Sequence, residues 1–250
     1  MIRIFENHFT SQLAELADHF FLISEEAAGF EPALMVFRPD RLQSMLNRFA
    51  ERYHEPEPRA VASQWSKLYF SRLILPAAAA AILFDWQLQL DLSTMRIAMD
   101  DDGGNIRFGL PSKGIQGAIH NPGERFSFLA DAHLRHVIPV LSDVSGLPPK
   151  VLWSNAGNIL ENVVQRSAAL LGSEHHGVRD GRNYLKIRRF EDGSFNPLFE
   201  PVRYIDHNGE VLRKRRICCF RYFIPALSIC KTCPLEKDTG HGKTTAPARH

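Results

Sequence analysis

The four cysteines of this chain all lie in one short stretch near the end of its 250 residues. They are Cys218, Cys219, Cys230 and Cys233, so the pattern is a vicinal pair, ten intervening residues and a Cys-x-x-Cys unit. Thiolates gathered in this way are typical of a metal or cluster site. The fold must bring both ends of the stretch together, and this requirement constrains the chain more than any other feature of its sequence.

The vicinal pair limits how such a centre can be bound. Successive side chains of a regular strand point to opposite faces, so Cys218 and Cys219 cannot both bind one small centre from a strand. Either the backbone bends at the pair, or the centre takes one sulfur on each of two metals. Tetrahedral zinc is usually held by two Cys-x-x-Cys units, whereas a two-iron cluster needs two thiolates on each iron. Spacing alone leaves zinc and iron–sulfur open.

Charge and hydropathy narrow the class of protein. The net charge of +2 implies no bulk attraction to nucleic acid or to a membrane. The first residues lack a basic segment followed by an apolar run, and so do not form a secretory signal. The most apolar stretch, residues 73–84, is shorter than the roughly 20 residues that span a bilayer. We therefore expect a cytoplasmic protein. In that reducing compartment clustered cysteines are metal ligands more often than disulfides, and disulfide bonding is the alternative interpretation.

Apolar spacing predicts a mainly helical chain. Helices are expected to begin near residue 10, at Asp40 and near Arg59, to cover about 121–141, and to run from Pro149 to Gly172. Pro76 is expected to kink or end the third helix. Residues 173–183 are predicted to be loop and 184–190 extended.

Turn signals predict two antiparallel hairpins. The first joins residues 88–99 to 106–108, and the second joins 202–206 to 210–217 through His207-Asn208-Gly209. The predicted fold class is therefore α+β, a mainly helical body with small antiparallel hairpins and a C-terminal four-cysteine module. We expect four regions: a helical N-terminal extension (1–58), a helical body with one hairpin (59–172), the cluster region (173–238) and a disordered tail (239–250).

The cysteine stretch resembles the C-terminal signature of the FhuF-like ferric siderophore reductases. The shared features are a basic lead-in, the vicinal pair, an Arg-Tyr dipeptide and the Cys-x-x-Cys unit. Here they are Arg215-Arg216, Cys218-Cys219, Arg221-Tyr222 and Cys230-x-x-Cys233. Looser similarity extends over residues 59–235. The resemblance implies a 2Fe-2S cluster on all four cysteines, and it favours iron over zinc.

The resemblance also implies an activity. It indicates a ferric siderophore reductase that transfers one electron to an Fe(III) chelate, of the hydroxamate type, and releases Fe(II) for iron assimilation. An external one-electron donor would be needed for this activity. Peripheral association of the protein with the cytoplasmic face of the inner membrane is compatible with the activity. Two other functions stay open: a zinc-stapled binding protein, and an iron–sulfur sensor without turnover.

Two groups of residues are candidates for contact with the chelate or the donor. One is a tryptophan beside a polar helix stripe, for which a solvated helix face is the alternative. The other is the basic rim of the cysteines, where positive charge favours the reduced cluster and attracts acidic partners. An ordinary charged rim is the alternative there. The candidates are Trp153, Asn155, Asn158, Arg216, Arg221 and Tyr222.

Overall fold

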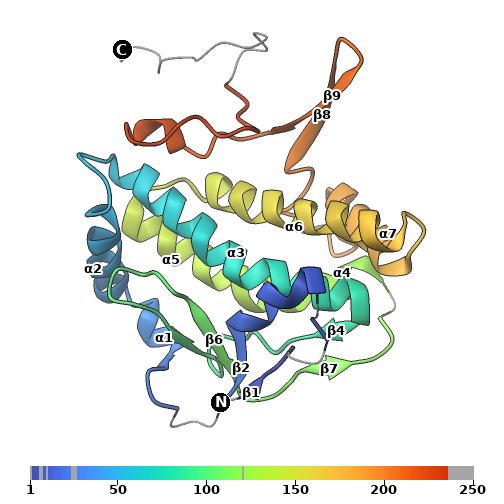
Figure 1. The fold of residues 1–250 in the computed structure, drawn as a ribbon, viewed down its shortest axis with the longest axis horizontal. Coiled ribbons are helices and arrows are strands. Elements are labelled where there is room, and N and C mark those ends of the chain that lie inside the picture. Colours follow the sequence, from blue (N-terminus) through green and yellow to red (C-terminus); the bar gives the residue numbers. More distant parts are fainter. Residues whose placement is uncertain (1, 6–7, 10, 24–26, 120, 236–250) are drawn as a thin grey trace.

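The computed structural model describes residues 2–5, 8–9, 11–23, 27–119 and 121–235. Its fold class is α+β, as predicted. Two long helices lie side by side at the centre, α3 (Pro58–Phe84) and α6 (Pro149–Leu171), and the cysteine segment lies across one end of both (Figure 1). The shorter helices are α1 (Ala33–Val36), α2 (Pro39–Ala50), α4 (Pro122–Leu129), α5 (Arg135–Ser145) and α7 (His176–Lys186), with the 3₁₀ segments η1 (Ser11–His19) and η3 (Arg221–Phe223) and the π segment η2 (Ala130–Leu134).

Helix α3 is buried along most of its length. Glu57 caps its start by accepting a hydrogen bond from the amide of Ala60, and Pro58 sits in the first turn, where its missing N–H costs nothing. Pro76 does not end the helix, because the buried residues around it pack on every side and outweigh the lost hydrogen bond. Among the described helices, α3 alone is long and apolar enough to span a membrane, yet 61% of that window is buried inside the protein.

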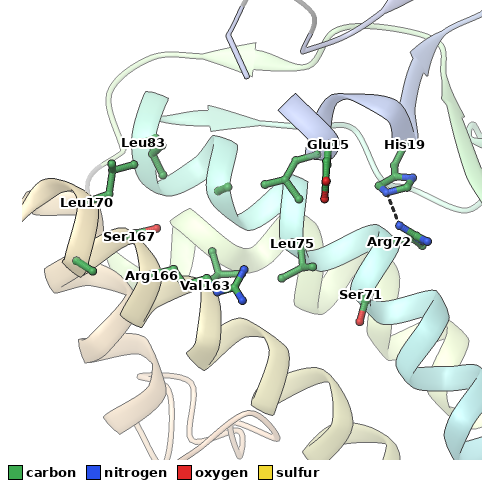
Figure 2. Close-up of a pocket in the computed structure, with 13 residues that line it drawn as sticks. Glu15, His19, Ser71, Arg72, Leu75, Leu83, Val163, Arg166, Ser167 and Leu170 are labelled. Atoms are coloured by element: carbon green, nitrogen blue, oxygen red, sulfur yellow. Dashed lines mark hydrogen bonds between the residues drawn. The ribbon is translucent and has the colours of Figure 1, made fainter. Parts of the chain in front are cut away.

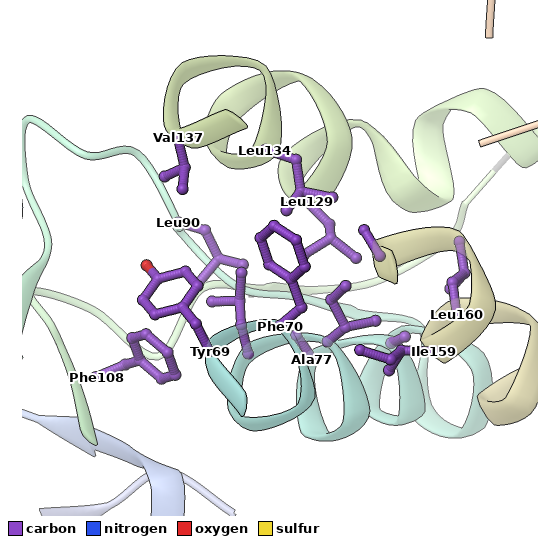
Figure 3. Close-up of a cluster of buried hydrophobic side chains, with 14 of the residues drawn as sticks. Tyr69, Phe70, Ala77, Leu90, Phe108, Leu129, Leu134, Val137, Ile159 and Leu160 are labelled. Atoms are coloured by element: carbon purple, nitrogen blue, oxygen red, sulfur yellow. The ribbon is translucent and has the colours of Figure 1, made fainter. Parts of the chain in front are cut away.

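The hydrophobic core forms where α3 meets the strands, α4, α5 and α6 (Figure 3). Tyr69 and Phe70 are its central rings, and both are fully buried. The hydroxyl of Tyr69 is hydrogen-bonded to His133 at 2.8 Å, and the other ring nitrogen of His133 lies 3.0 Å from the carbonyl oxygen of Leu90. Every polar side-chain atom of this pair therefore has a partner inside the core.

Five short strands form one sheet in the order β1-β2-β6-β5-β3. The predicted first hairpin is present as β5 and β6, with Ile97 opposite Phe108. The N-terminal region was expected to be helical, but it also contains strands. Strand β2 pairs with β6, and β3 pairs with β5. Edge pairing on a sheet overrides the helical spacing of that segment. The strands are β1 (Ile2–Arg3), β2 (Phe20–Leu22), β3 (Glu31–Pro32), β4 (Trp86–Gln87), β5 (Arg96–Ala98), β6 (Arg107–Leu110), β7 (Ile115–Gln116), β8 (Val202–His207) and β9 (Glu210–Arg215).

The loop predicted after Gly172 is wrong, because α7 begins at His176. Its glycines do not signal flexibility. A Cβ on Gly177 would lie 2.2 Å from the carbonyl oxygen of Ile82, and one on Gly181 would lie 2.6 Å from Val164. Both glycines therefore let α7 pack closely against α3 and α6.

The second predicted hairpin is confirmed as β8 and β9. Asn208 and Gly209 both have positive φ, 54° and 85°, as a two-residue hairpin turn requires. Strand β9 ends at Arg215, two residues earlier than expected. The predicted disordered tail lies outside the described residues, and the division into four regions stays a prediction.

Candidate metal centre

The vicinal cysteines lie just beyond the end of β9, in irregular backbone. The strand stops at Arg215, and Phe220, directly after the pair, is left-handed with φ 57°. A hydrogen bond of 2.8 Å from the amide of Arg215 to the carbonyl of Thr232 ties the strand to the Cys-x-x-Cys unit. The backbone therefore bends at the pair, which was one of the two alternatives that the sequence allowed.

The four thiols are free, and two of them are close together. The Sγ atoms of Cys219 and Cys230 lie 3.9 Å apart. Two sulfurs bound to one tetrahedral metal at about 2.3 Å would lie about 3.8 Å apart, so this pair has the spacing of ligands on a common metal. Within residues 2–235 as described, no set of three or more Cys, His, Asp or Glu side chains converges on a metal-sized site. The arrangement thus provides one ligand pair, with Cys218 and Cys233 nearby in the chain.

Helix α3 supplies two contacts to Cys219. The Oγ of Ser63 donates a hydrogen bond of 2.7 Å to its carbonyl oxygen, and the Nζ of Lys67 lies 3.5 Å from its Sγ. Ser63 and Lys67 are four residues apart, so they lie on the same face of the helix. Burial lowers the pKa of Lys67, whereas the neighbouring Cys219 raises it. The α3 surface therefore positions both the backbone and the sulfur of this cysteine.

Arg215 is a second cation beside the thiols. It is 2% exposed, and its guanidinium donates to Asn155 Oδ1 and, at 3.3 Å, to Ser154 Oγ. Among the described residues it has no carboxylate partner, and its Nε–H is a buried donor without an acceptor. Burial lowers the pKa of Arg215, and the thiols of Cys219, Cys230 and Cys218 oppose that shift. A buried cation without a counter-charge is costly by several kcal/mol.

The two cations polarise the cysteine pair. A hydrogen bond from Cys230 and the charges of Lys67 and Arg215 lower the pKa of Cys219 to about 4, against the cost of burial. The same hydrogen bond raises the pKa of Cys230. Burial raises the pKa of Cys218 to about 11. The two cations thus favour the thiolate form of Cys219, the sulfur that lies closest to Lys67.

The donor set fits a metal or cluster held by thiolates. Such a centre carries net negative charge, which would compensate Lys67 and Arg215 and accept from the unpartnered Nε–H of Arg215. Four neutral thiols would leave both cations uncompensated in a low-dielectric site. The residues therefore suit an anionic group on Cys218, Cys219, Cys230 and Cys233, and they do not by themselves distinguish zinc from iron–sulfur.

The predicted polar stripe on α6 is not a solvated face. Asn155 is fully buried, and its amide donates to the carbonyl of Ser63 and to the hydroxyls of Ser63 and Ser66. Asn158 is half-buried, and its carbonyl accepts from Arg213 at 3.1 Å. Both asparagines thus connect α6 to the elements that hold the cysteines.

Trp153 and Arg216 line one cavity of about 330 Å³, together with Ile217, the residue before Cys218. Lys150 and Phe199 also line it, and its surface is mostly apolar. Arg216 is exposed and forms an ion pair with Glu200. The structure therefore brings two predicted contact residues, distant in sequence, to the same place.

Arg221 and Tyr222 lie in η3, directly after the vicinal pair. The Nε of Arg221 donates to the carbonyl of Ser228 at 2.8 Å, which closes the loop between the two halves of the cysteine pattern. Its NH1 reaches Gln64 on α3 at 3.4 Å. Burial, and then the charge of Cys218, raise the pKa of Tyr222. Arg221 thus makes structural contacts, while Tyr222 is half-exposed beside the thiols.

The sequence interpretation missed Ser63 and Lys67. A signal was present, since the tract Ser63-Gln64-Trp65-Ser66-Lys67 places four polar residues in an otherwise apolar core helix. Buried polar residues need partners, so this tract indicated that something polar covers the start of α3.

Comparisons with known proteins identify the family of the chain. A family model described as ferric iron reductase FhuF-like transporter matches residues 63–211, more than half of the chain and ending before the cysteines. A curated protein of Escherichia coli (strain K12), named ferric siderophore reductase, is 24% identical over 206 residues, which cover 79% of this chain and 76% of that protein. The match begins at Ser63, the residue that holds Cys219, and on this evidence the chain belongs to the FhuF-like ferric iron reductase family.

Proposed function

We propose that this protein is a cytoplasmic ferric siderophore reductase that uses a 2Fe-2S cluster on Cys218, Cys219, Cys230 and Cys233. The observation that carries the proposal is the pairing of four free thiols with two cations that lack any carboxylate partner among the described residues. Family membership and the relative's name support the reaction. An external donor would supply the electron.

The chemistry of the chelate explains why one electron is enough. A siderophore holds Fe(III) through hard, charged oxygen ligands, and Fe(II) is softer and less charged, so the same oxygens hold it more weakly. One-electron reduction therefore releases the iron as Fe(II). A bound 2Fe-2S cluster would supply this one-electron chemistry.

The residues around the thiols have distinct roles in this proposal. Lys67 and Arg215 compensate the negative charge of the centre and favour its more negative, reduced state. Ser63 fixes the backbone of Cys219, and Asn155 holds Arg215. Asn155 has all its amide contacts within the protein, so we propose that it acts by positioning Arg215 and not by contacting the chelate.

The cavity lined by Trp153 and Arg216 is our proposed site for the ferric chelate. Arg216 is two residues from Cys218, so a chelate bound there would lie close to the vicinal pair. The indole of Trp153 offers a flat apolar wall, and Lys150 attracts the oxygen-rich surface of a hydroxamate chelate, while the charge of Arg216 is shared with Glu200 on the same wall. Asn158, Arg221 and Tyr222 surround the same end of the molecule.

The test is a spectrum of the anaerobically purified protein, followed by turnover. We expect visible absorption that bleaches on reduction, a paramagnetic signal in the reduced state, and iron with acid-labile sulfide. A ferric hydroxamate siderophore added to the reduced protein should restore the oxidised spectrum and yield Fe(II), captured by a colourless ferrous chelator. A colourless protein with bound zinc would instead establish the stapled binding protein. A cluster that reoxidises with oxygen but not with the chelate would establish a sensor.

A further inference from the structure

A second cavity, of about 600 Å³, opens between η1, α3 and α6 (Figure 2). Of the residues that the structure describes, none that lines it belongs to the cysteine segment or to the cavity beside Trp153. Its volume lies within the range of about 300–1,000 Å³ that small-molecule sites occupy. The proposed reaction makes no use of it.

The walls of this cavity are aliphatic. Leu75 and Leu83 come from α3, Val163 and Leu170 from α6, and Leu16 from η1. No Phe, Tyr or Trp is among the described residues that line it. An aromatic ligand would normally find rings to stack on, so these walls suit a flexible chain of methylene groups.

Two guanidinium groups face this apolar space. Arg72 projects from α3 and Arg166 from α6, on opposite walls (Figure 2). Neither has a carboxylate partner within the described part of the chain, and Arg72 forms a hydrogen bond of 2.9 Å with His19. Burial and the neighbouring Arg72 lower the pKa of His19 to about 4. His19 is therefore neutral near pH 7, so it orients Arg72 without cancelling its charge.

The charge of the walls selects the charge of the ligand. Among the described residues that line the cavity, Glu15 alone is acidic, and it lies near His19 at the upper rim (Figure 2). Two arginines and one glutamate leave a single positive charge. A ligand with one negative charge balances this positive charge, whereas a dianion would leave one negative charge uncompensated.

We propose that this cavity binds an aliphatic monoanion, with its methylene chain against the leucines and its charged head between Arg72 and Arg166. The lining from Arg72 to Leu83 extends over twelve residues of α3, or about 16 Å, so a chain of medium length fits. A free aliphatic carboxylate and the acyl chain of an anionic lipid share this chemistry.

The test is calorimetric titration of the full chain with sodium decanoate below its micellar concentration. Decyltrimethylammonium provides the same chain with the opposite charge, and butyrate provides the head without the chain. We expect one decanoate per protein, and binding at least about tenfold weaker for both analogues, which corresponds to about 1.4 kcal/mol each. Equal affinity for the two decyl compounds would overturn the proposal.

Variants locate the ligand in the cavity. Arg166→Glu should weaken decanoate at least tenfold, and Leu170→Gln, at a residue that is 56% exposed, should weaken it several-fold without unfolding the protein. Arg179→Glu makes the same charge change on the exposed face of α7, away from the cavity, and should leave binding unaltered. If Arg166→Glu binds decanoate as the natural protein does, the site is not this cavity.

Flotation with phosphatidylglycerol vesicles separates the two sources of the ligand. Decanoate binding in solution supports a free carboxylate. Binding to vesicles without decanoate binding, when lost in Arg166→Glu and kept in Arg179→Glu, supports a lipid chain. Absence of both overturns the proposal, and neither result depends on the cluster or on reductase activity.

Discussion

The two ends of α3 are buried in opposite ways. From Tyr69 onward the helix lies in an apolar core whose polar atoms pair with one another, as Tyr69 and His133 do. Toward its start, Ser63 and Lys67 face a segment that holds four free thiols and the buried cation Arg215. The core is complete as it stands, whereas the cysteine end has positive charge that requires a negative partner.

This contrast indicates a division of labour. Burial of apolar area at roughly 25 cal/mol per Å² makes the core the source of stability. The cysteine end also buries apolar side chains such as Ile224, but it includes Arg215, which is costly without a counter-charge. The core should therefore fold without a metal, and the cysteine segment should order fully only when its thiolates bind one.

Loss of a cysteine should have the largest effect, because it should abolish the metal centre and leave the fold of the core unchanged. Cys219→Ser is expected to abolish the visible chromophore, because each iron needs two protein thiolates, while far-ultraviolet circular dichroism stays that of the natural protein. Thr232→Ser, inside the Cys-x-x-Cys unit but without a thiol, is the matched control and should keep both properties. Full cluster occupancy in Cys219→Ser would remove that residue from the ligand set.

A core substitution should have the opposite effect. Phe70→Ala is expected to lower the free energy of unfolding by about 3–5 kcal/mol, since it opens a cavity in a fully buried site. The exposed Phe223 is the control in the cysteine segment, and Phe223→Ala should change stability by under about 0.5 kcal/mol. Urea titration followed by circular dichroism measures both, and similar losses from the two variants would contradict the division.

Acid should weaken the core through His133. Burial lowers the pKa of this residue to about 4 from an ordinary value near 6.5, so the unfolded chain takes up the proton first as pH falls. Stability should therefore decline between about pH 6.5 and 4, by up to about 3 kcal/mol from this group. The pKa of His19 is also lowered, so His19 contributes to the same decline. The measurement is therefore the slope of the free energy of unfolding against pH, compared between the natural protein and His133→Gln. Identical slopes would show that the pKa of His133 is the same in the folded and unfolded states, which would contradict the prediction.

Removal of one positive charge at the cysteine end should have the smallest of these effects. Lys67→Met is expected to lower the midpoint potential of the cluster, on the order of tens of millivolts, because positive charge favours the reduced state; about 59 mV corresponds to each tenfold change for one electron. Arg216→Gln should shift it less, since Arg216 is exposed and paired with Glu200. Redox titration of both variants compares them, and a larger shift from Arg216 would reverse their assigned roles.

The element content was largely predictable from local patterns. The bounds of α2 and α6 and both hairpins follow from apolar spacing, proline starts, glycine ends and the Asn-Gly turn. The failures have one cause, which is tertiary packing. Strand β2 forms because it pairs with β6, and α7 forms because its glycines fit against α3 and α6, and neither partner is close in sequence.

The sequence by itself determined the cysteine set, the family resemblance and the fold class, because all three depend on residue type and short spacing. Only the tertiary structure decided which groups surround the thiols. Lys67 lies 152 residues from Cys219, and Asn155 lies 60 residues from Arg215. Such contacts depend on how α3 and α6 pack, and a local pattern cannot specify them because they are set by the burial of the whole core.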